Sequence, residues 1–375
     1  MKSYDLVIVG VGAMGSSALY HASRRGLKVL GIERFGEVPH EQGSHHGSTR
    51  IIRKAYFEHP GYVPLLLRAY ELWEQLEREV DEKLIVKCGG LMIGSPTSEV
   101  VTGAILAAQR HELTYEVLSK QDVQRRYPFF ALDDTQQAVF EPDAGYLFSE
   151  LAVKAHVQQA IKAGAELKLG CQVAGWSKSG DGVEIQISGE TVYADKLLLT
   201  VGAWAPNFID KSRFQVERQV LHWFEPEEAS TAGLPIYIVE EQDGSTFYGF
   251  PNIPLQGLKV AIHHGGENCT ADTVDRVVHP ADIKRMRFAL SRRIPSLAAS
   301  RLIKTSACMY TNTPDFHFIV GPHPEEENVI LGLGYSGHGF KFSSVMGELL
   351  VKMALGENTI QVPEIFAPDR FAQAR

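Results

Sequence analysis

The chain has 375 residues, of which 44% are hydrophobic and 22% charged, so it is an ordinary globular protein with room for two or three domains. The formal net charge of -8 argues against a nucleic-acid surface, and no apolar run approaches the roughly 20 residues that span a bilayer. The four cysteines are far apart and form no CxxC pair, which excludes a disulfide framework and favours a reducing, cytoplasmic setting.

Strands and helices alternate along the chain. In order, the apolar patterns predict a strand over 5–9, a helix over 13–25 that ends at Gly26, a strand over 28–33, helices over 61–79 and 150–164, short strands between 165 and 200, a β-rich stretch over 216–265 with a hairpin turn at Asp243-Gly244, a strand over 328–334 and a helix over 340–355. We therefore expect an α/β fold, α+β overall, in which a Rossmann-like nucleotide-binding domain is interleaved with a β-sheet-rich substrate domain. The first domain is expected to comprise 1–85, 150–215 and 305–375, and the second 86–149 and 216–304.

A glycine-rich turn follows the first predicted strand. Residues 10–15 are GVGAMG, a GxGxxG that opens a helix and is followed by Glu33 at the end of the next strand. Gly10 permits the tight turn, Gly12 lets the backbone approach a pyrophosphate, and Gly15 lets the helix pack closely on the strand. Glu33 would accept hydrogen bonds from ribose hydroxyls and repel a 2′-phosphate, although the neighbouring Arg34 weakens that exclusion. The pattern predicts an ADP-containing cofactor and leaves FAD and NAD open.

The loop after the second strand, 43–53, has the sequence GSHHGSTRIIR. On a helix, Arg50 and Arg53 would share one face, because they lie three residues apart. Two guanidinium groups together suit a carboxylate or the polar edge of a cofactor. His45 and His46 could suggest a metal, but no third ligand is suitably spaced, so no metal is expected.

A second glycine-rich element, near the C-terminus, bears on the choice of cofactor. Gly332, Gly334, Gly337 and Gly339 lie between a predicted strand and a helix that begins near Phe340. The N-terminus of that helix would stabilise a reduced flavin, whose negative charge is centred on N1 and the C2 carbonyl. The element therefore favours a flat second ligand such as flavin, with a plain strand–turn–helix as the alternative.

Six motifs, in order along the chain, resemble those of the monomeric sarcosine oxidase family, which includes N-methyltryptophan oxidase. They are the GxGxxG, GSHHGSTRIIRKAY at 43–56, YGFP at 248–251, GLKVAIHHGG at 257–266, ACMYT at 307–311 and YSGHGFKFSS at 335–344. The resemblance implies a flavin-dependent amine oxidase whose FAD is attached covalently, through an 8α-S-cysteinyl bond, to Cys308. Ser48 and Lys54 depart from the family, which often has Asp and His there, and this bears on the detail of the pocket.

The same resemblance implies roles for individual residues. Arg53 and Lys341 would hold the carboxylate of the substrate, and Tyr248 and His263 would line the substrate side of the flavin. Lys259 would lie near flavin N5 and assist oxygen, because a nearby cation lowers the energy of superoxide. The implied catalytic residues are Lys259, Arg50, His263 and Tyr248, and the implied cofactor-binding residues are Gly10, Gly12, Ala13, Met14, Gly15, Glu33, Arg34, Ser44, Thr49, Arg50, Val173, Gly202, Cys308, Gly337, Gly339, Phe340 and Lys341.

The implied reaction oxidises a secondary (N-methyl) amino acid such as sarcosine with O2 and produces hydrogen peroxide. Hydrolysis of the imine yields the demethylated amino acid and formaldehyde. Other secondary amines, such as N-methyltryptophan, pipecolate or a glycated amino acid, are alternatives, as are an NAD-dependent dehydrogenase and a non-catalytic flavin-binding protein. The expected partners are the small-molecule amine and O2, with no nucleic acid and no membrane, and the protein is expected to be a cytoplasmic monomer.

Overall fold

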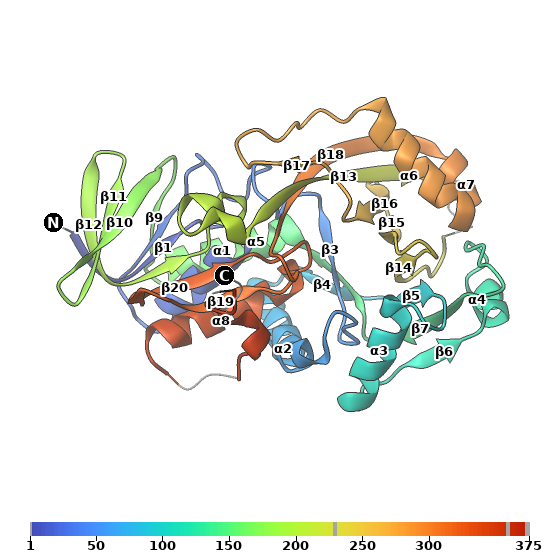
Figure 1. The fold of residues 1–375 in the computed structure, drawn as a ribbon, viewed down its shortest axis with the longest axis horizontal. Helices are drawn as coiled ribbons and strands as arrows, with labels where there is room; N and C mark the ends of the chain where they lie inside the picture. The colour runs from blue at the N-terminus through green and yellow to red at the C-terminus, as the bar shows by residue number, and fades with distance from the viewer. Residues whose placement is uncertain (1, 228–230, 358–360, 372–375) are drawn as a thin grey trace.

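Two bodies make up the molecule, and the chain passes between them several times (Figure 1). The computed structural model describes residues 2–227, 231–357 and 361–371. The first body holds a sheet of eight strands in the order β10-β11-β12-β1-β2-β9, with β20 beside β12 and β19 beside β20. Its strands are β1 (Lys2–Val9), β2 (Val29–Ile32), β9 (Glu166–Lys168), β10 (Val173–Ser179), β11 (Gly182–Ile187), β12 (Glu190–Leu199), β19 (Ile319–His323) and β20 (Glu326–Leu333).

Parallel pairing in this sheet brings the ends of three distant strands to one edge. β1 pairs in parallel with β2 and β12, and β12 pairs in parallel with β20. Gly10, Thr200 and Gly334 follow directly after β1, β12 and β20. Because ligands of open α/β sheets bind beyond the carboxyl ends of the strands, this edge is where a nucleotide is expected.

Helices α1 (Ala13–Ser23), α2 (Val63–Val80), α5 (Ser149–Lys162) and α8 (Ser343–Ala354) pack together in the core of the first body. The Ser17 hydroxyl of α1 donates to Ser344 O of α8 at 3.2 Å, across 327 residues of sequence. A Cβ added at Gly347 would lie 2.5 Å from the carbonyl carbon of Ser17 and 2.6 Å from Ala18 N. This contact fixes the C-terminal helix on the helix that opens the glycine-rich motif.

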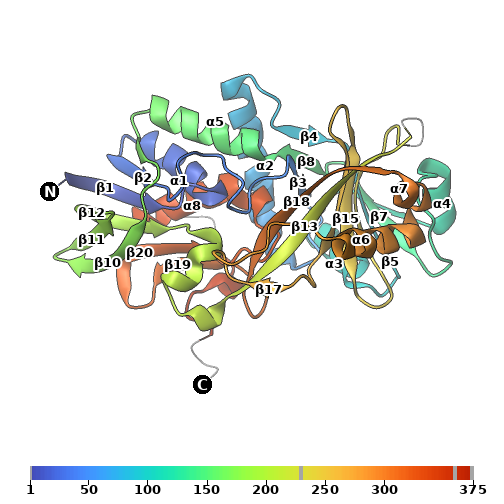
Figure 2. The same cartoon turned by 90° about the horizontal axis from the view of Figure 1, so that it is seen from above.

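The second body holds a sheet of nine strands in the order β17-β13-β16-β15-β14-β5-β7-β6, with β18 beside β13. Its strands are β5 (Gly90–Gly94), β6 (Glu116–Leu118), β7 (Gln137–Glu141), β13 (Gln215–Glu225), β14 (Ile236–Glu240), β15 (Thr246–Ile253), β16 (Gly257–His263), β17 (Asn268–Cys269) and β18 (Arg301–Asn312). Its helices are α3 (Glu99–Arg110), α4 (Lys120–Arg126), α6 (Pro280–Arg293) and α7 (Pro295–Ala299). In Figure 2 the long strands β13 and β18 run from this body toward the first.

A third, small sheet contains part of the segment 43–53, which we call the arginine loop, and it corrects one expectation. Its strands, in the order β3-β8-β4, are β3 (Thr49–Ile52), β8 (Gly145–Phe148) and β4 (Ile85–Lys87). The helical arrangement considered for Arg50 and Arg53 is wrong, because Arg50 lies on strand β3 and pairs with Leu147. The β-branched Ile51 and Ile52 favour the extended backbone, and β8 supplies its hydrogen bonds.

The other predicted elements lie close to their expected positions, and the α/β fold is confirmed. Helix α1 ends at Ser23 rather than 25, and Gly26 takes the left-handed φ of +75° beyond it. The hairpin turn at Asp243-Gly244 joins β14 and β15 as expected. The short 3-10 turns are η1 (Pro60–Tyr62), η2 (Gly202–Asn207), η3 (Lys211–Arg213), η5 (Phe340–Phe342) and η6 (Glu364–Phe366). The domain boundaries stay a prediction, and within the described ranges no helix is long and apolar enough to cross a membrane.

The close approach of α1 and α8 generates a prediction for Gly347→Ala. The added methyl group would press on the backbone of Ser17 and Ala18, so we expect a loss of about 1–3 kcal/mol in the free energy of unfolding. Urea denaturation followed by circular dichroism measures it. Gly175→Ala is the control, because a Cβ there meets no atom within 4 Å. Equal stabilities for the two variants would contradict the packing argument.

Candidate active site

A cavity connects the glycine-rich turn of the first body with the sheet of the second. The residues singled out by sequence that line it are Gly10, Gly12, Ala13, Met14, Glu33, Arg34, Ser44, Arg50, Arg53, Val173, Gly202, Tyr248, His263, Cys308, Gly337, Gly339, Phe340 and Lys341. Gly15, Thr49 and Lys259 are not part of this lining. The fold therefore gathers most of the predicted residues around one space.

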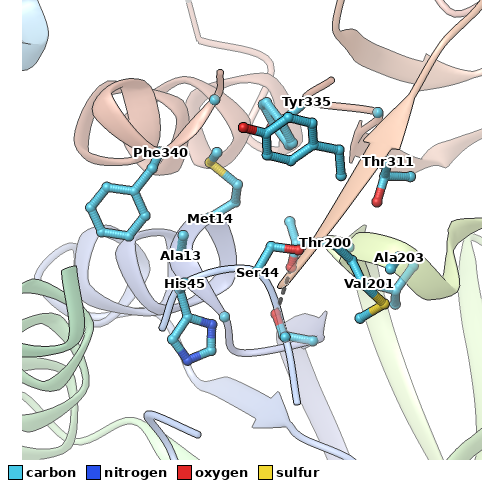
Figure 3. A pocket seen from close by; sticks show the side chains of 18 of the residues that line it. Ala13, Met14, Ser44, His45, Thr200, Val201, Ala203, Thr311, Tyr335 and Phe340 are labelled. Atoms are coloured by element: carbon cyan, nitrogen blue, oxygen red, sulfur yellow. Dashed lines mark hydrogen bonds between the residues drawn. The ribbon is translucent and has the colours of Figure 1, made fainter. Parts of the chain in front are cut away.

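At the nucleotide end, the backbone forms much of the cavity wall. Gly10 has a φ of +88°, and a Cβ there would lie 2.6 Å from Thr200 O, while a Cβ at Gly15 would overlap the Gly10 carbonyl. At Gly12 the nearest atom to an added Cβ is 3.5 Å away, so its backbone is open to the cavity. Ala13 begins α1 without a side-chain cap, and Figure 3 shows it beside the cavity. Unbonded N–H groups at a helix N-terminus bind phosphate, so this end fits a dinucleotide.

The acidic residue of the motif is held in place beside this turn. Glu33 is 5% exposed, and its carboxylate accepts a hydrogen bond from the Val11 N–H at 2.9 Å. Arg34 stacks on Trp204, 4.5 Å from the ring centre, and lies 3.3 Å from a carboxylate oxygen of Asp272. The Arg34 guanidinium is therefore engaged with Asp272, and the other Glu33 carboxylate oxygen accepts the Phe35 N–H at 3.2 Å.

The second glycine-rich element packs tightly around aromatic rings at the opposite wall. Gly337 has a φ of +80°, and a Cβ there would lie 2.5 Å from the Tyr310 ring; at Gly339 it would lie 2.7 Å from the Tyr335 ring. Phe340 begins the 3-10 turn η5, which leads into α8 and also lines the cavity (Figure 3). A helix N-terminus lies here, as expected from the sequence, and no side chain caps it.

Cys308 lies on β18 with its thiol in the cavity wall, and it is 2% exposed. Arg50 Nη2 lies 3.9 Å from the Cys308 sulfur and donates to Ser44 O at 2.8 Å. Burial would raise the pKa of Cys308, but the neighbouring His46 and the Arg50 guanidinium outweigh it and lower that pKa to about 6. The charged groups around this cysteine therefore favour its thiolate form.

Two basic side chains and one carboxylate also line the cavity. Arg53 Nη2 donates to both carboxylate oxygens of Glu58, at 2.8 and 2.6 Å. Its Nε is buried and has no hydrogen-bond partner among the described residues. Lys341 Nζ donates to the His338 carbonyl at 2.7 Å, and burial, reinforced by the charge of Arg53, lowers the pKa of Lys341 to about 7.

Tyr248 and His263 lie on neighbouring strands β15 and β16, with ring centres 6.1 Å apart. His263 Nδ1 lies 3.2 Å from the Tyr310 hydroxyl. Burial, followed by the neighbouring His264, holds the pKa of His263 well below its usual value, so its imidazole is neutral at pH 7. Burial likewise raises the pKa of Tyr248, which stays a phenol.

Lys259 lies behind the lining, under the arginine loop, and is 2% exposed. Its Nζ donates to Gly47 O at 2.7 Å and to Thr49 O at 2.6 Å, and it sits 4.7 Å from the Phe250 ring centre. The side chain of Lys259 therefore does not face water. Thr49, one of the expected cofactor-binding residues, supplies a carbonyl to this lysine, and its contact with a cofactor stays a prediction.

Sequence reasoning missed Glu58 and Tyr310. Glu58 follows Arg53 by five residues and Tyr310 lies inside the quoted ACMYT motif, so both were in view. The short spacing of Glu58 and Arg53 was the signal that could have indicated their pairing, whereas no local pattern pairs Tyr310 with His263, which lies on another strand. Throughout the described segments, no three His, Cys, Asp or Glu side chains are grouped as a metal site would require.

Known proteins resemble this chain in both sequence and fold. The sequence matches the family of FAD-dependent oxidoreductases (DAO) over residues 5–353. It is 41% identical to monomeric sarcosine oxidase from Streptomyces avermitilis, over 99% of both chains, and 35% identical to N-methyl-L-tryptophan oxidase from Yersinia pestis (strain Pestoides F), over 94% of this chain and 95% of that relative. The crystal structure of L-proline dehydrogenase from P. horikoshii superposes with a TM-score of 0.85 at 19% identity, covering 100% of this chain and 99% of that one.

The environment of Cys308 generates a prediction for Arg50→Gln. Removing the guanidinium beside the thiol should raise the pKa of Cys308 by about one unit, because a nearby cation favours the thiolate. Thiolate absorbance of the cofactor-free protein, titrated against pH and corrected with Cys308→Ser, measures it. A titration identical to that of the unmodified chain would show that Arg50 has no part in activating this cysteine.

Proposed function

Because this chain belongs to the DAO family of FAD-dependent oxidoreductases and is a relative of the monomeric sarcosine oxidases, we propose that it oxidises a secondary N-methyl amino acid such as sarcosine. O2 is the proposed oxidant and hydrogen peroxide a product, and hydrolysis of the imine would release the demethylated amino acid and formaldehyde. The observation that carries the proposal is the meeting, in one cavity, of a nucleotide turn, Cys308 and the cations Arg53 and Lys341.

Arg53 and Lys341 are the proposed binding pair for the carboxylate of the substrate. The Arg53 guanidinium already binds the carboxylate of Glu58, which supports its proposed role in binding a substrate carboxylate. A bound substrate must displace Glu58 or share the two cations with it. The charge of Lys341 then matters, because without it two carboxylates would face one guanidinium.

The remaining residues divide the work around the cofactor. Bound FAD supplies the two-electron chemistry between the amine and O2. Cys308 is the proposed covalent attachment point, since its thiol lies in the cavity wall and ionises readily. His263 and Tyr248 would orient the amine without taking its proton. Lys259, from behind the lining, would lower the energy of the negative charge that develops on oxygen.

The proposal is tested by the visible spectrum of the purified protein before and after acid precipitation, followed by anaerobic addition of sarcosine. Yellow colour that stays in the precipitate, and is lost on Cys308→Ser, supports covalent attachment. Bleaching by sarcosine, with recovery in air, supports the reaction. If N-methyltryptophan or pipecolate bleaches the protein and sarcosine does not, the reaction class stands and the substrate is corrected. A colourless protein would overturn the proposal.

The lowered pKa of Lys341 generates a pH prediction that is independent of amine chemistry. Below its pKa of about 7 the ammonium is charged and attracts a carboxylate; as pH rises through that value the charge is lost in the unliganded site. Binding of acetate, followed by the flavin spectrum, should therefore weaken about tenfold between about pH 6 and pH 8. Lys341→Met should bind acetate weakly and without this dependence. A flat profile in the unmodified protein would exclude Lys341 from carboxylate binding.

A further inference from the structure

Glu150, in the first turn of α5, directs its carboxylate at the backbone of the arginine loop. It accepts the Gly47 N–H at 2.7 Å on Oε1, and the Ser48 N–H at 3.0 Å on Oε1 and 3.1 Å on Oε2. The Ser149 hydroxyl donates to it at 2.8 Å. Glu150 is not among the residues that line the cavity.

The other side of the same two peptide groups faces two cations. The peptide whose N–H belongs to Ser48 has its carbonyl on Gly47, and that oxygen accepts Lys259 Nζ at 2.7 Å. The preceding peptide, whose N–H belongs to Gly47, has its carbonyl on His46, and that oxygen accepts Arg50 Nη2 at 2.5 Å. Each peptide group is therefore hydrogen-bonded at one end to an anion and at the other to a cation.

The backbone of the arginine loop has an unfavourable conformation at two consecutive residues. Gly47 has a φ of +95° and Ser48, which is not a glycine, has a φ of +69°. A non-glycine residue in the left-handed region is strained and persists where its surroundings hold it. The charged groups on both sides of the loop supply that hold, since hydrogen bonds to charged groups are the stronger ones.

We propose that Glu150 is a positioning residue, which holds Lys259 and Arg50 in place through the two polarised peptide groups, one leading to each of them, and which favours the charged form of Lys259. A peptide that donates to a carboxylate becomes a better acceptor at its carbonyl, so the negative charge acts beyond its own contacts. The inference rests on the proposed function only in giving Lys259 its part in the reaction with O2.

The charges around Lys259 agree with this assignment. Burial first, and then the charge of Arg50, hold the pKa of Lys259 well below its usual value. Lys304 acts in the same direction, whereas Glu150 and the Cys308 thiolate oppose it. Replacing Glu150 by a neutral residue would therefore lower the pKa of Lys259 further.

The experiment measures reoxidation without using an amine. The holoprotein is reduced with dithionite, mixed with O2 in a stopped-flow instrument, and followed across the pH range. The reoxidation rate is expected to fall as pH rises and Lys259 loses its proton. Glu150→Gln should move the pH midpoint of this fall down by about one pH unit and should slow reoxidation about tenfold at pH values above the new midpoint. The same shift should appear in the cofactor-free protein, in an NMR titration of Lys259 assigned with Lys259→Met. Glu150→Asp, which keeps the charge, should fold and show a smaller shift.

Glu77→Gln is the matched control. The Glu77 carboxylate also accepts two consecutive backbone N–H groups, those of Leu84 and Ile85, at 2.8 and 3.0 Å, but these residues do not line the cavity. If Glu77→Gln and Glu150→Gln behave alike, or if the Glu150→Gln effect persists in a Lys259→Met background, the proposal is overturned. If reoxidation shifts as expected but sarcosine does not reduce the protein, the assignment of Glu150 stands and the proposed substrate falls.

Discussion

The burial of positive charge around one cavity is the constraint on which the site depends. Arg53, Lys259 and Lys341 are each at most 6% exposed. Removing one partner of a buried ion pair costs about 3–5 kcal/mol, so each cation needs acceptors within reach. Glu58 serves Arg53, loop carbonyls serve Lys259, and the His338 carbonyl serves Lys341. The two lysines, which depend on neutral acceptors, are the two whose pKa is lowered.

The interleaving of the two bodies makes this arrangement possible. The parallel sheet delivers the nucleotide turn and the second glycine-rich element to one edge, while β16 and β18 carry Lys259 and Cys308 in from the other body. The small sheet lies between them, and its pairing of β3 with β8 places the start of α5 against the arginine loop. No single body holds all the groups that face the cavity, so the site exists only when both are packed together.

The parts of the site that could be predicted from sequence are those built from neighbouring residues. Gly10 and Glu33 belong to one strand–helix–strand unit, and the turn they form depends on local backbone conformation. The arginine loop was harder. Its strand β3 pairs with β8 (Gly145–Phe148), which lies almost a hundred residues later in the chain. The spacing of Arg50 and Arg53 does not indicate that partner strand.

The sequence by itself determined the α/β class and the nucleotide turn, because both depend on residue type and on the local conformation of neighbouring residues. Through the resemblance of its motifs, it also indicated the residues that are proposed to carry chemistry. Only the tertiary structure decided which carboxylate faces which cation. Glu58 pairs with Arg53, and Glu150 reaches Lys259 through a loop from which both are remote in sequence. Glu58 is close to Arg53 in sequence, but the burial of both, and the approach of Glu150 to the loop, arise only when the chain packs, so the ionisation of the site is a property of the folded chain.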